Sequence, residues 1–131
     1  MKQALLPPGW AAPRGYANGV AARGTQVFIA GQIGWDSEAR FHTSDFAAQA
    51  KQALQNVVDV LAEAGGRPEH LVRLTWYVTD KREYLAALKE IGRAFRELIG
   101  DYDIAMSAVQ VAALIEDEAK VEIEATAVIP D

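Results

Sequence analysis

The chain has 131 residues, 50% of them hydrophobic, which is enough to fill the core of one domain and too little for two. Its 18 acidic side chains outnumber the 13 basic ones, the formal charge is −5, and the basic residues are scattered, which argues against a nucleic-acid partner. There is no cysteine and there are only 2 histidines, so thiol chemistry is excluded and we expect no metal site.

The N-terminal residues MKQALLPPGW carry one lysine, a short apolar step and then two prolines. Such a segment is too short and too interrupted for a signal peptide or a membrane span. We therefore expect one domain over residues 1–131 in a cytoplasmic protein without a membrane partner, with residues 1–15 as an extended N-terminal segment.

The stretch GVAARGTQVFIAGQI, residues 19–33, contains two β-prone runs separated by Arg23 and Gly24. Because glycine supplies the positive φ of a tight turn, this pattern predicts a β-hairpin. After a polar connection, Thr43, Ser44 and Asp45 offer N-cap oxygens to a following helix.

That first helix is predicted over FAAQAKQALQNVVDVLAEA, because its apolar residues recur at helical spacing, and Gly65 with Gly66 should end it. Residues 72–78 then alternate between apolar and polar side chains, which predicts a strand with two distinct faces.

Asp80 is placed to cap a second helix, KREYLAALKEIGRAFRELI, which Gly100 should end. Its apolar side chains are expected to face inward, namely Leu85, Leu88, Ile91, Phe95 and Leu98. Gly92 in its interior costs about 1 kcal/mol relative to alanine, so we expect close backbone packing there. The charged residues of this helix, Arg96 among them, alternate in sign and predict a solvated face.

Two more strands are predicted over residues 105–113 and 119–129, which gives the order β-β-α-β-α-β-β. Both helices have one apolar stripe, so we expect an α/β (α+β) fold with a single mixed β-sheet and the helices packed on one face. The other face would then expose a large apolar patch, formed by Trp76 or Tyr77 with Phe28, Val109 and Val128. A closed cyclic oligomer is the simplest way to bury it.

Four segments, FIAGQI, QALQNVVDVLAEAGG, VRLTWYVTD and VEIEATAVIP, occur in an order and spacing that resemble the RidA (YjgF) family. This family of enamine and imine deaminases is also called the endoribonuclease L-PSP family, and the resemblance extends over residues 16–130. It implies a chorismate-mutase-like fold and a homotrimer whose sheets form a central barrel. Small molecules would bind in clefts between the subunits.

The resemblance also implies site residues. In deaminating members an arginine holds the substrate carboxylate, and the matching residue here is Met106, whose thioether cannot form that pair. Glu122 matches the glutamate that positions the attacking water, and Tyr16 matches a tyrosine of the cleft. Ala30 stands where many members have serine.

Backbone N–H groups around Gly31 and Ser107 remain as donors in the expected cleft. Each assignment has a plainer alternative: Glu122 as a solvated strand residue, and Met106 as interface packing. Arg14 is the candidate to replace the guanidinium of the family arginine, although its plainer alternative, a mobile arginine on the surface, is favoured. Trp10 and Trp35 could roof the cleft or simply pack in loops.

The leading hypothesis is an imine or enamine deaminase, or a related hydrolase, that acts on a small molecule other than the standard 2-imino acids. It would need neither a metal nor an organic cofactor, because a protonated imine is already electrophilic. The alternative is a trimer without catalysis that binds a small metabolite or shields partner proteins. Endoribonuclease activity is a third and weaker reading, because the chain is acidic.

Overall fold

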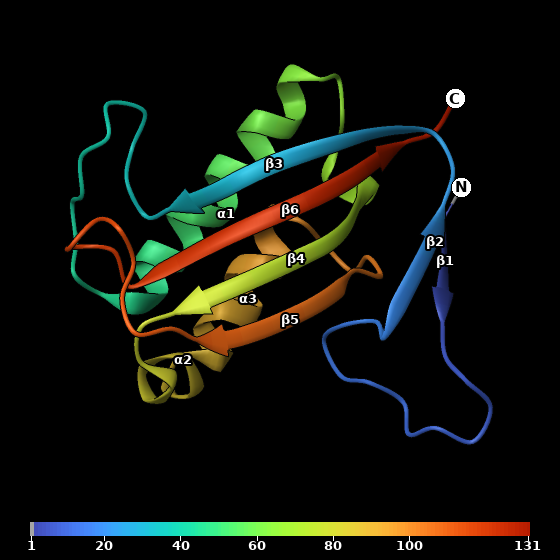
Figure 1. The fold of residues 1–131 in the computed structure, drawn as a ribbon, viewed down its shortest axis with the longest axis horizontal. Helices are drawn as coiled ribbons and strands as arrows, with labels where there is room; N and C mark the ends of the chain where they lie inside the picture. Colours follow the sequence, from blue (N-terminus) through green and yellow to red (C-terminus); the bar gives the residue numbers. More distant parts are fainter. Residues whose placement is uncertain (1) are drawn as a thin grey trace.

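The computed structural model describes residues 2–131 as a mixed α+β fold (Figure 1). In chain order its elements are β1 (Lys2–Leu5), β2 (Gly19–Ala22), β3 (Thr25–Ile33), α1 (Phe46–Glu63), the 3-10 helix η1 (Pro68–His70), β4 (Leu71–Val78), α2 (Lys81–Ala86), α3 (Leu88–Leu98), β5 (Ala105–Gln110) and β6 (Val121–Ile129). The main sheet has four strands in the order β3-β6-β4-β5, and β1 and β2 form a second sheet of two strands.

The main sheet is mixed, as expected: β4 runs parallel to β5 and antiparallel to β6, and β6 is antiparallel to β3. The helices lie together on one face of this sheet, and the two-stranded sheet stands to one side of it (Figure 1). Between sheet and helices lies the core, whose largest fully buried side chains include Leu54, Leu61, Leu71, Leu74, Ile104 and Ile123. The expectation of an α+β fold with helices on one sheet face is confirmed, and the separate small sheet is an addition to it.

The predicted hairpin over residues 19–33 is wrong. β2 pairs with β1, whereas β3 pairs with β6, so the two runs belong to different sheets. A two-residue type I′ turn needs positive φ at both central residues, and Arg23 does not have one. Gly24 instead lies against the end of β6, where a Cβ would come within 2.0 Å of the Ile129 carbonyl oxygen. Gly24 therefore allows two strands to approach closely and does not form a chain reversal.

Both ends of α1 are confirmed. The Asp45 carboxylate accepts a hydrogen bond from the Ala48 N–H at 3.0 Å, which caps the first turn. At the other end Gly65 has a φ of +79°, and the N–H groups of Gly65 and Gly66 donate to the carbonyls of Ala62 and Leu61. This is the Schellman arrangement that the glycine pair indicates.

The second predicted helix is two helices, α2 and α3, which meet at Ala87. Asp80 caps α2 as expected, because its carboxylate accepts from the Arg82 N–H at 2.8 Å. The interruption at Ala87 changes which side chains face the core. Leu85 and Leu88, expected to point inward, are 55% and 46% exposed, and Ile91 is buried.

The open face of the main sheet carries the apolar side chains that the alternation predicts. Phe28 is 74% exposed there, and Val109 is also exposed. Of the two aromatic residues left open for this face, Tyr77 lies on it and hydrogen-bonds the Glu124 carboxylate, whereas Trp76 is 3% exposed and belongs to the core. The hydrogen bond to Glu124 is the main reason why the pKa of Tyr77 is raised.

Candidate functional site

Glu122 lies on the open face of the sheet, because its neighbours Val121 and Ile123 face the core. The pairing of β3 with β6 shifts between Ile29 and Gln32, which makes Ala30 and Gly31 a bulge two residues from Ile33, the partner of Glu122. Gly31 lies in this bulge, and a Cβ on it would come within 2.0 Å of the Glu122 Oε2. The missing side chain of Gly31 thus makes room for the carboxylate, and the two predicted site residues are neighbours.

Ala30 precedes Gly31 in the same bulge and is exposed. Its carbonyl accepts a hydrogen bond from the Gln32 Nε2 at 3.1 Å. The first group of site residues is therefore Ala30, Gly31 and Glu122, gathered where β3 meets β6.

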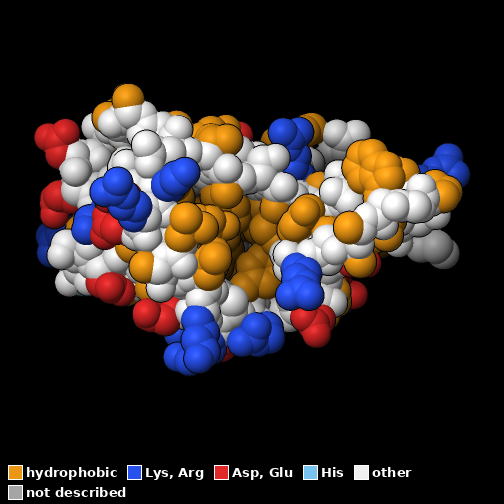
Figure 2. Space-filling view, turned by 90° about the horizontal axis from the view of Figure 1, so that it is seen from below, with side chains coloured by type: hydrophobic (Ala, Val, Ile, Leu, Met, Phe, Trp, Pro, Cys, Tyr) orange, Lys and Arg blue, Asp and Glu red, His pale blue; other side chains and the backbone are white. Residues whose placement is uncertain are grey.

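The other three predicted residues, Tyr16, Met106 and Ser107, line a cavity of about 650 Å³ between β5, α3 and residues 13–16. The N-terminal segment is held there by Ala17, whose N–H donates to the Ile104 carbonyl at 2.9 Å and which bridges to Ala105. Figure 2 shows hydrophobic side chains gathered in a hollow on this side of the molecule, with Lys and Arg side chains around it.

The floor of the cavity is mainly apolar. Met106 is half-buried and packs against the core, and Trp76, Tyr84 and Phe95 add aromatic surface. The Tyr84 ring lies edge-on to Trp76, with 6.1 Å between the ring centroids. Burial raises the pKa of the Tyr84 phenol, so the phenol is neutral at physiological pH. An uncharged, partly desolvated floor of this kind suits a ligand with an apolar portion.

Gly92 and Arg96 also line this cavity, and neither was expected there. Apart from the adjoining residues and the backbone of the same helix, one atom would lie within 4 Å of a Cβ on Gly92. It is the Nη1 of Arg96, at 3.4 Å. The expected close backbone packing at Gly92 is therefore wrong, and the position opens to the cavity. Arg96 is exposed, as expected of a solvated face, and its guanidinium also lies near Gly92, one helical turn away.

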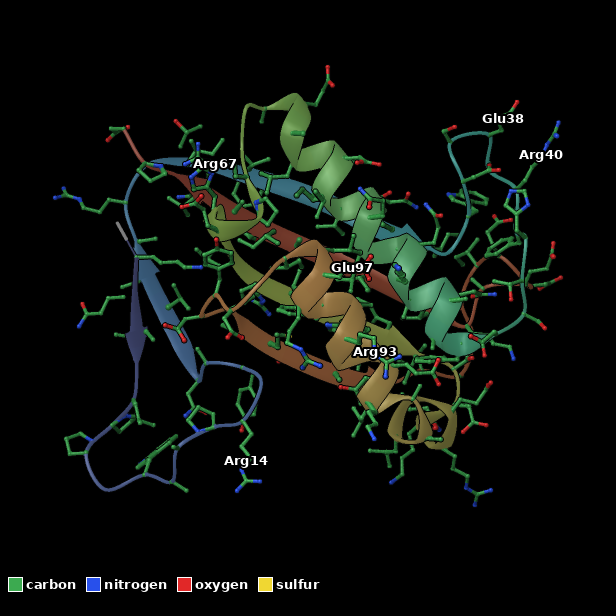
Figure 3. All side chains as sticks on the ribbon, turned by 180° about the vertical axis from the view of Figure 1, so that it is seen from behind. Arg14, Glu38, Arg40, Arg67, Arg93 and Glu97 are labelled. Carbon is green, nitrogen blue, oxygen red and sulfur yellow. The ribbon has the colours of Figure 1, made fainter. Side chains whose placement is uncertain are left out.

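Arg14 reaches the same cavity from its rim, where it is exposed. In Figure 3 its side chain points away from the sheet and helices. Trp10 and Trp35 are not among the lining residues; Trp35 packs instead on Phe41, with ring centroids 5.8 Å apart. The plainer alternative of loop packing thus describes Trp35.

The two groups of predicted residues do not share one cavity within a chain. β5 is two strand spacings from β6, which carries Glu122, and three from β3, which carries Ala30 and Gly31, or roughly 10 and 14 Å. Glu122 and Met106 also lie on opposite sheet faces, since Met106 packs against the core. Ala30, Gly31 and Glu122 are accordingly not among the residues that line the cavity of their own chain.

A second cavity, of about 590 Å³, lies between residues 41–44 and residues 112–120. The buried Gln49 joins these loops: its amide donates to the carbonyls of Thr43 and Glu118 and accepts from the Lys120 N–H. His42 lies at this cavity and pairs with Asp36 at 2.5 Å. None of the predicted site residues lines it.

Residues 2–131 contain no cluster of three or more His, Asp or Glu side chains that could hold a metal ion. Within the same range, no helix is both long and apolar enough to cross a membrane.

Residues 9–129 match the family model described as endoribonuclease L-PSP. The chain therefore belongs to the RidA/YjgF family, as the four sequence segments indicated. Among curated proteins, it is 35% identical to the 2-iminobutanoate/2-iminopropanoate deaminase of Salmonella typhimurium, over 86% of each chain. A RutC family protein of Aquifex aeolicus is 32% identical over 86% of this chain and 87% of that one.

Solved structures give the same assignment. The Rid family protein YyfB of Yersinia pestis superposes with a TM-score of 0.86 at 31% identity and covers 98% of both chains. The structure of Escherichia coli TdcF with bound serine gives a TM-score of 0.71 at 32% identity, over 93% of this chain and 92% of that one.

Proposed function

We propose that the protein hydrolyses imines or enamines of a small metabolite in clefts between the copies of a homotrimer. Glu122 is the general base. The observation that carries this proposal is the contact between Glu122 and Gly31, which places a carboxylate beside the exposed backbone of a strand bulge.

The reaction needs no group beyond a base and a water. Glu122 removes a proton from water as the oxygen adds to the carbon of the protonated imine, which gives a tetrahedral amino alcohol. Glu122 then gives this proton to the amino nitrogen and, again a carboxylate, removes the hydroxyl proton as the C–N bond breaks, which releases ammonia and leaves a carbonyl product; Glu122 finally passes its proton to solvent. Backbone N–H groups near Gly31 can donate hydrogen bonds to the oxygen of the carbonyl as it forms.

The separation of the two groups supports a site shared between chains. If the β5 edge of one copy faces the β3 edge of the next, the cavity with Tyr16, Met106 and Ser107 meets Glu122 of its neighbour. Such a contact joins two different surfaces, so it generates a ring when the rotation closes. Deaminase names among the relatives and the exposed apolar face of the sheet agree with this arrangement.

Met106 determines which substrates are excluded. At the position of the family arginine it offers no charge for a carboxylate next to the imine carbon. We propose that small 2-imino acids such as 2-iminobutanoate are poor substrates and that Met106 contacts an apolar portion of the true one.

The test is ammonia release by the purified protein from a panel of freshly generated neutral and anionic imines, with Glu122→Gln beside Glu124→Gln. The control residue is two positions along the same strand face and is occupied by Tyr77. Glu122→Gln should lower kcat by about 100-fold or more, the usual contribution of a general base, and Glu124→Gln should leave turnover nearly intact. Equal activity of both variants, or no turnover across the panel, contradicts the proposal.

A trimer that only binds a ligand is the second candidate, and the apolar floor of the cavity favours it, because binding alone requires no base. In that case Glu122→Gln retains full ligand affinity and the natural protein releases no ammonia. The family description as an endoribonuclease is not supported by the charge of −5, which opposes the approach of RNA.

A further inference from the structure

The cavity beside β5 contains a cation that no family motif predicted. Arg96 on α3 is exposed and lines the cavity, and its Nη1 would lie 3.4 Å from a Cβ on Gly92, which places the guanidinium at the cavity. None of the ion pairs within residues 2–131 involves Arg96. An arginine at a cavity without a carboxylate partner among these ion pairs is available to bind an anionic group.

Gly92 also determines the shape of the cavity. Its Cα faces open space except for the Arg96 guanidinium, so any larger side chain would fill the slot or displace the arginine. With Gly92 the cavity reaches about 650 Å³, within the range of sites that take ligands much larger than a four-carbon acid. The apolar part of the cavity lining includes Trp76, Phe95 and Met106.

Two carboxylates, Asp101 and Asp103, lie on the same rim and must be weighed against the arginine. Asp103 is close to the ammonium of Lys2: burial lowers the pKa of Lys2, and the charges of Asp103 and Glu69 oppose that shift. Asp103 is thus partly neutralised within the chain. The two arginines of the lining, Arg14 and Arg96, equal these two aspartates in number, and the Lys2 ammonium, 5.6 Å from the centre of the Tyr102 ring of the lining, adds a third positive charge.

We propose that the ligand is an amphipathic carboxylate whose anionic group binds Arg96, with an apolar body lying in the slot over Gly92. This inference rests on the proposed function. In the substrate of that reaction, the apolar body separates the carboxylate from the reacting imine carbon. Arg96 is then a specificity-determining residue that enters the cleft from α3, whereas the family arginine would enter from β5.

The experiment measures binding, so it does not depend on turnover. Calorimetry on the intact protein compares 3-phenylpropanoate with butanoate, with the neutral 3-phenylpropanamide and with the cationic 3-phenylpropylamine. The variants are Arg96→Gln and the matched control Arg93→Gln, which removes a charge from the same helix outside the cavity lining (Figure 3). Gly92→Leu fills the slot, and its thermal unfolding is recorded to verify that it folds.

We expect 3-phenylpropanoate to bind more tightly than the other three probes. Arg96→Gln should weaken its binding about tenfold or more, as the loss of a charge-assisted hydrogen bond does, with no change in Arg93→Gln. Folded Gly92→Leu should lose binding as well. The proposal is overturned if the amine binds best, if Arg96→Gln binds the carboxylate as well as the natural protein, or if the natural protein binds none of the probes. Absence of ammonia release alongside Arg96-dependent binding would instead contradict the proposed function alone.

Discussion

At the scale of single residues, two glycines have a charged side chain beside them: Gly31 has the carboxylate of Glu122, and Gly92 has the guanidinium of Arg96. Glu122 and Gly31 were selected by resemblance, and the structure brings them into contact. Arg96 was missed because a charge pattern on a helix looks the same whether its arginine faces bulk water or bends over a glycine. The i and i+4 spacing of Gly92 and Arg96 indicated that the two residues are neighbours on the helix surface. It could not indicate a cavity, because the cavity depends on the position of the neighbouring strand.

The first prediction at this scale concerns Met106. Met106→Arg should give or increase ammonia release from 2-iminobutanoate, because a bidentate guanidinium–carboxylate pair replaces a thioether. A pair of this kind contributes roughly 1.5–3 kcal/mol, so we expect kcat/KM to rise by about 10-fold to 100-fold.

Met106→Gln serves as the control, because it is polar and of similar length but uncharged. Initial rates with both variants and the natural protein decide the matter. High activity of the natural protein on 2-iminobutanoate would mean that another group already binds the carboxylate, and that Met106 does not exclude this substrate.

At the scale of elements, the sequence predicted the helix caps correctly but not which strands pair with each other. The caps of α1 and α2 were visible because Asp45, Asp80 and the Gly65–Gly66 pair act within one turn of their own position. The pairing of β2 with β1 and of β3 with β6 depends on contacts between distant segments, which no turn signal contains. The break at Ala87 has no glycine or proline to mark it.

A prediction at this scale concerns the loop between β3 and α1. The Asp36 carboxylate accepts hydrogen bonds from the N–H groups of Glu38 and Arg40 at 2.8 and 3.0 Å and pairs with His42. The hydrogen bond from His42 is the largest cause that lowers the pKa of Asp36 below its usual 3.8.

Because the folded pKa is lowered, the carboxylate stabilises the loop at pH values above 3.8, and this contribution disappears as the pH falls through the folded value. Hydrogen exchange of the Glu38 and Arg40 amides should therefore become faster, after correction for intrinsic rates, below about pH 4. In Asp36→Asn the amides should be poorly protected at every pH, whereas Glu38→Gln should behave as the natural protein does. Protection that is independent of pH in the natural protein would contradict this account.

At the scale of the whole molecule, the open sheet face was predicted from alternation alone, and Phe28 and Val109 lie on it exposed. The sequence could not reveal that Glu122 and Gly31 lie two and three strand spacings from Met106, since that depends on the strand order β3-β6-β4-β5. This separation leads to a prediction about mixed assemblies.

Glu122→Gln and Gly92→Leu damage different halves of the proposed shared site. When the two inactive variants are unfolded together and refolded as a mixture, some clefts combine the intact cavity of one chain with the intact glutamate of the other. Random assembly with a heterologous contact makes about one quarter of the clefts complete, so activity should return to about that level. Separately refolded variants mixed afterwards are the control, and persistent inactivity of the co-refolded mixture would place both groups in one chain.

The small sheet of β1 and β2 has a consequence for the lifetime of the protein. Two strands alone are marginally stable in water, and this pair stands to one side of the main body (Figure 1). The connection between them carries the exposed Arg14, where a trypsin-like protease would cut and separate one strand from the other. If assembly covers this arm, dilution uncovers it, so the rate of proteolysis becomes a measure of the protein's own concentration.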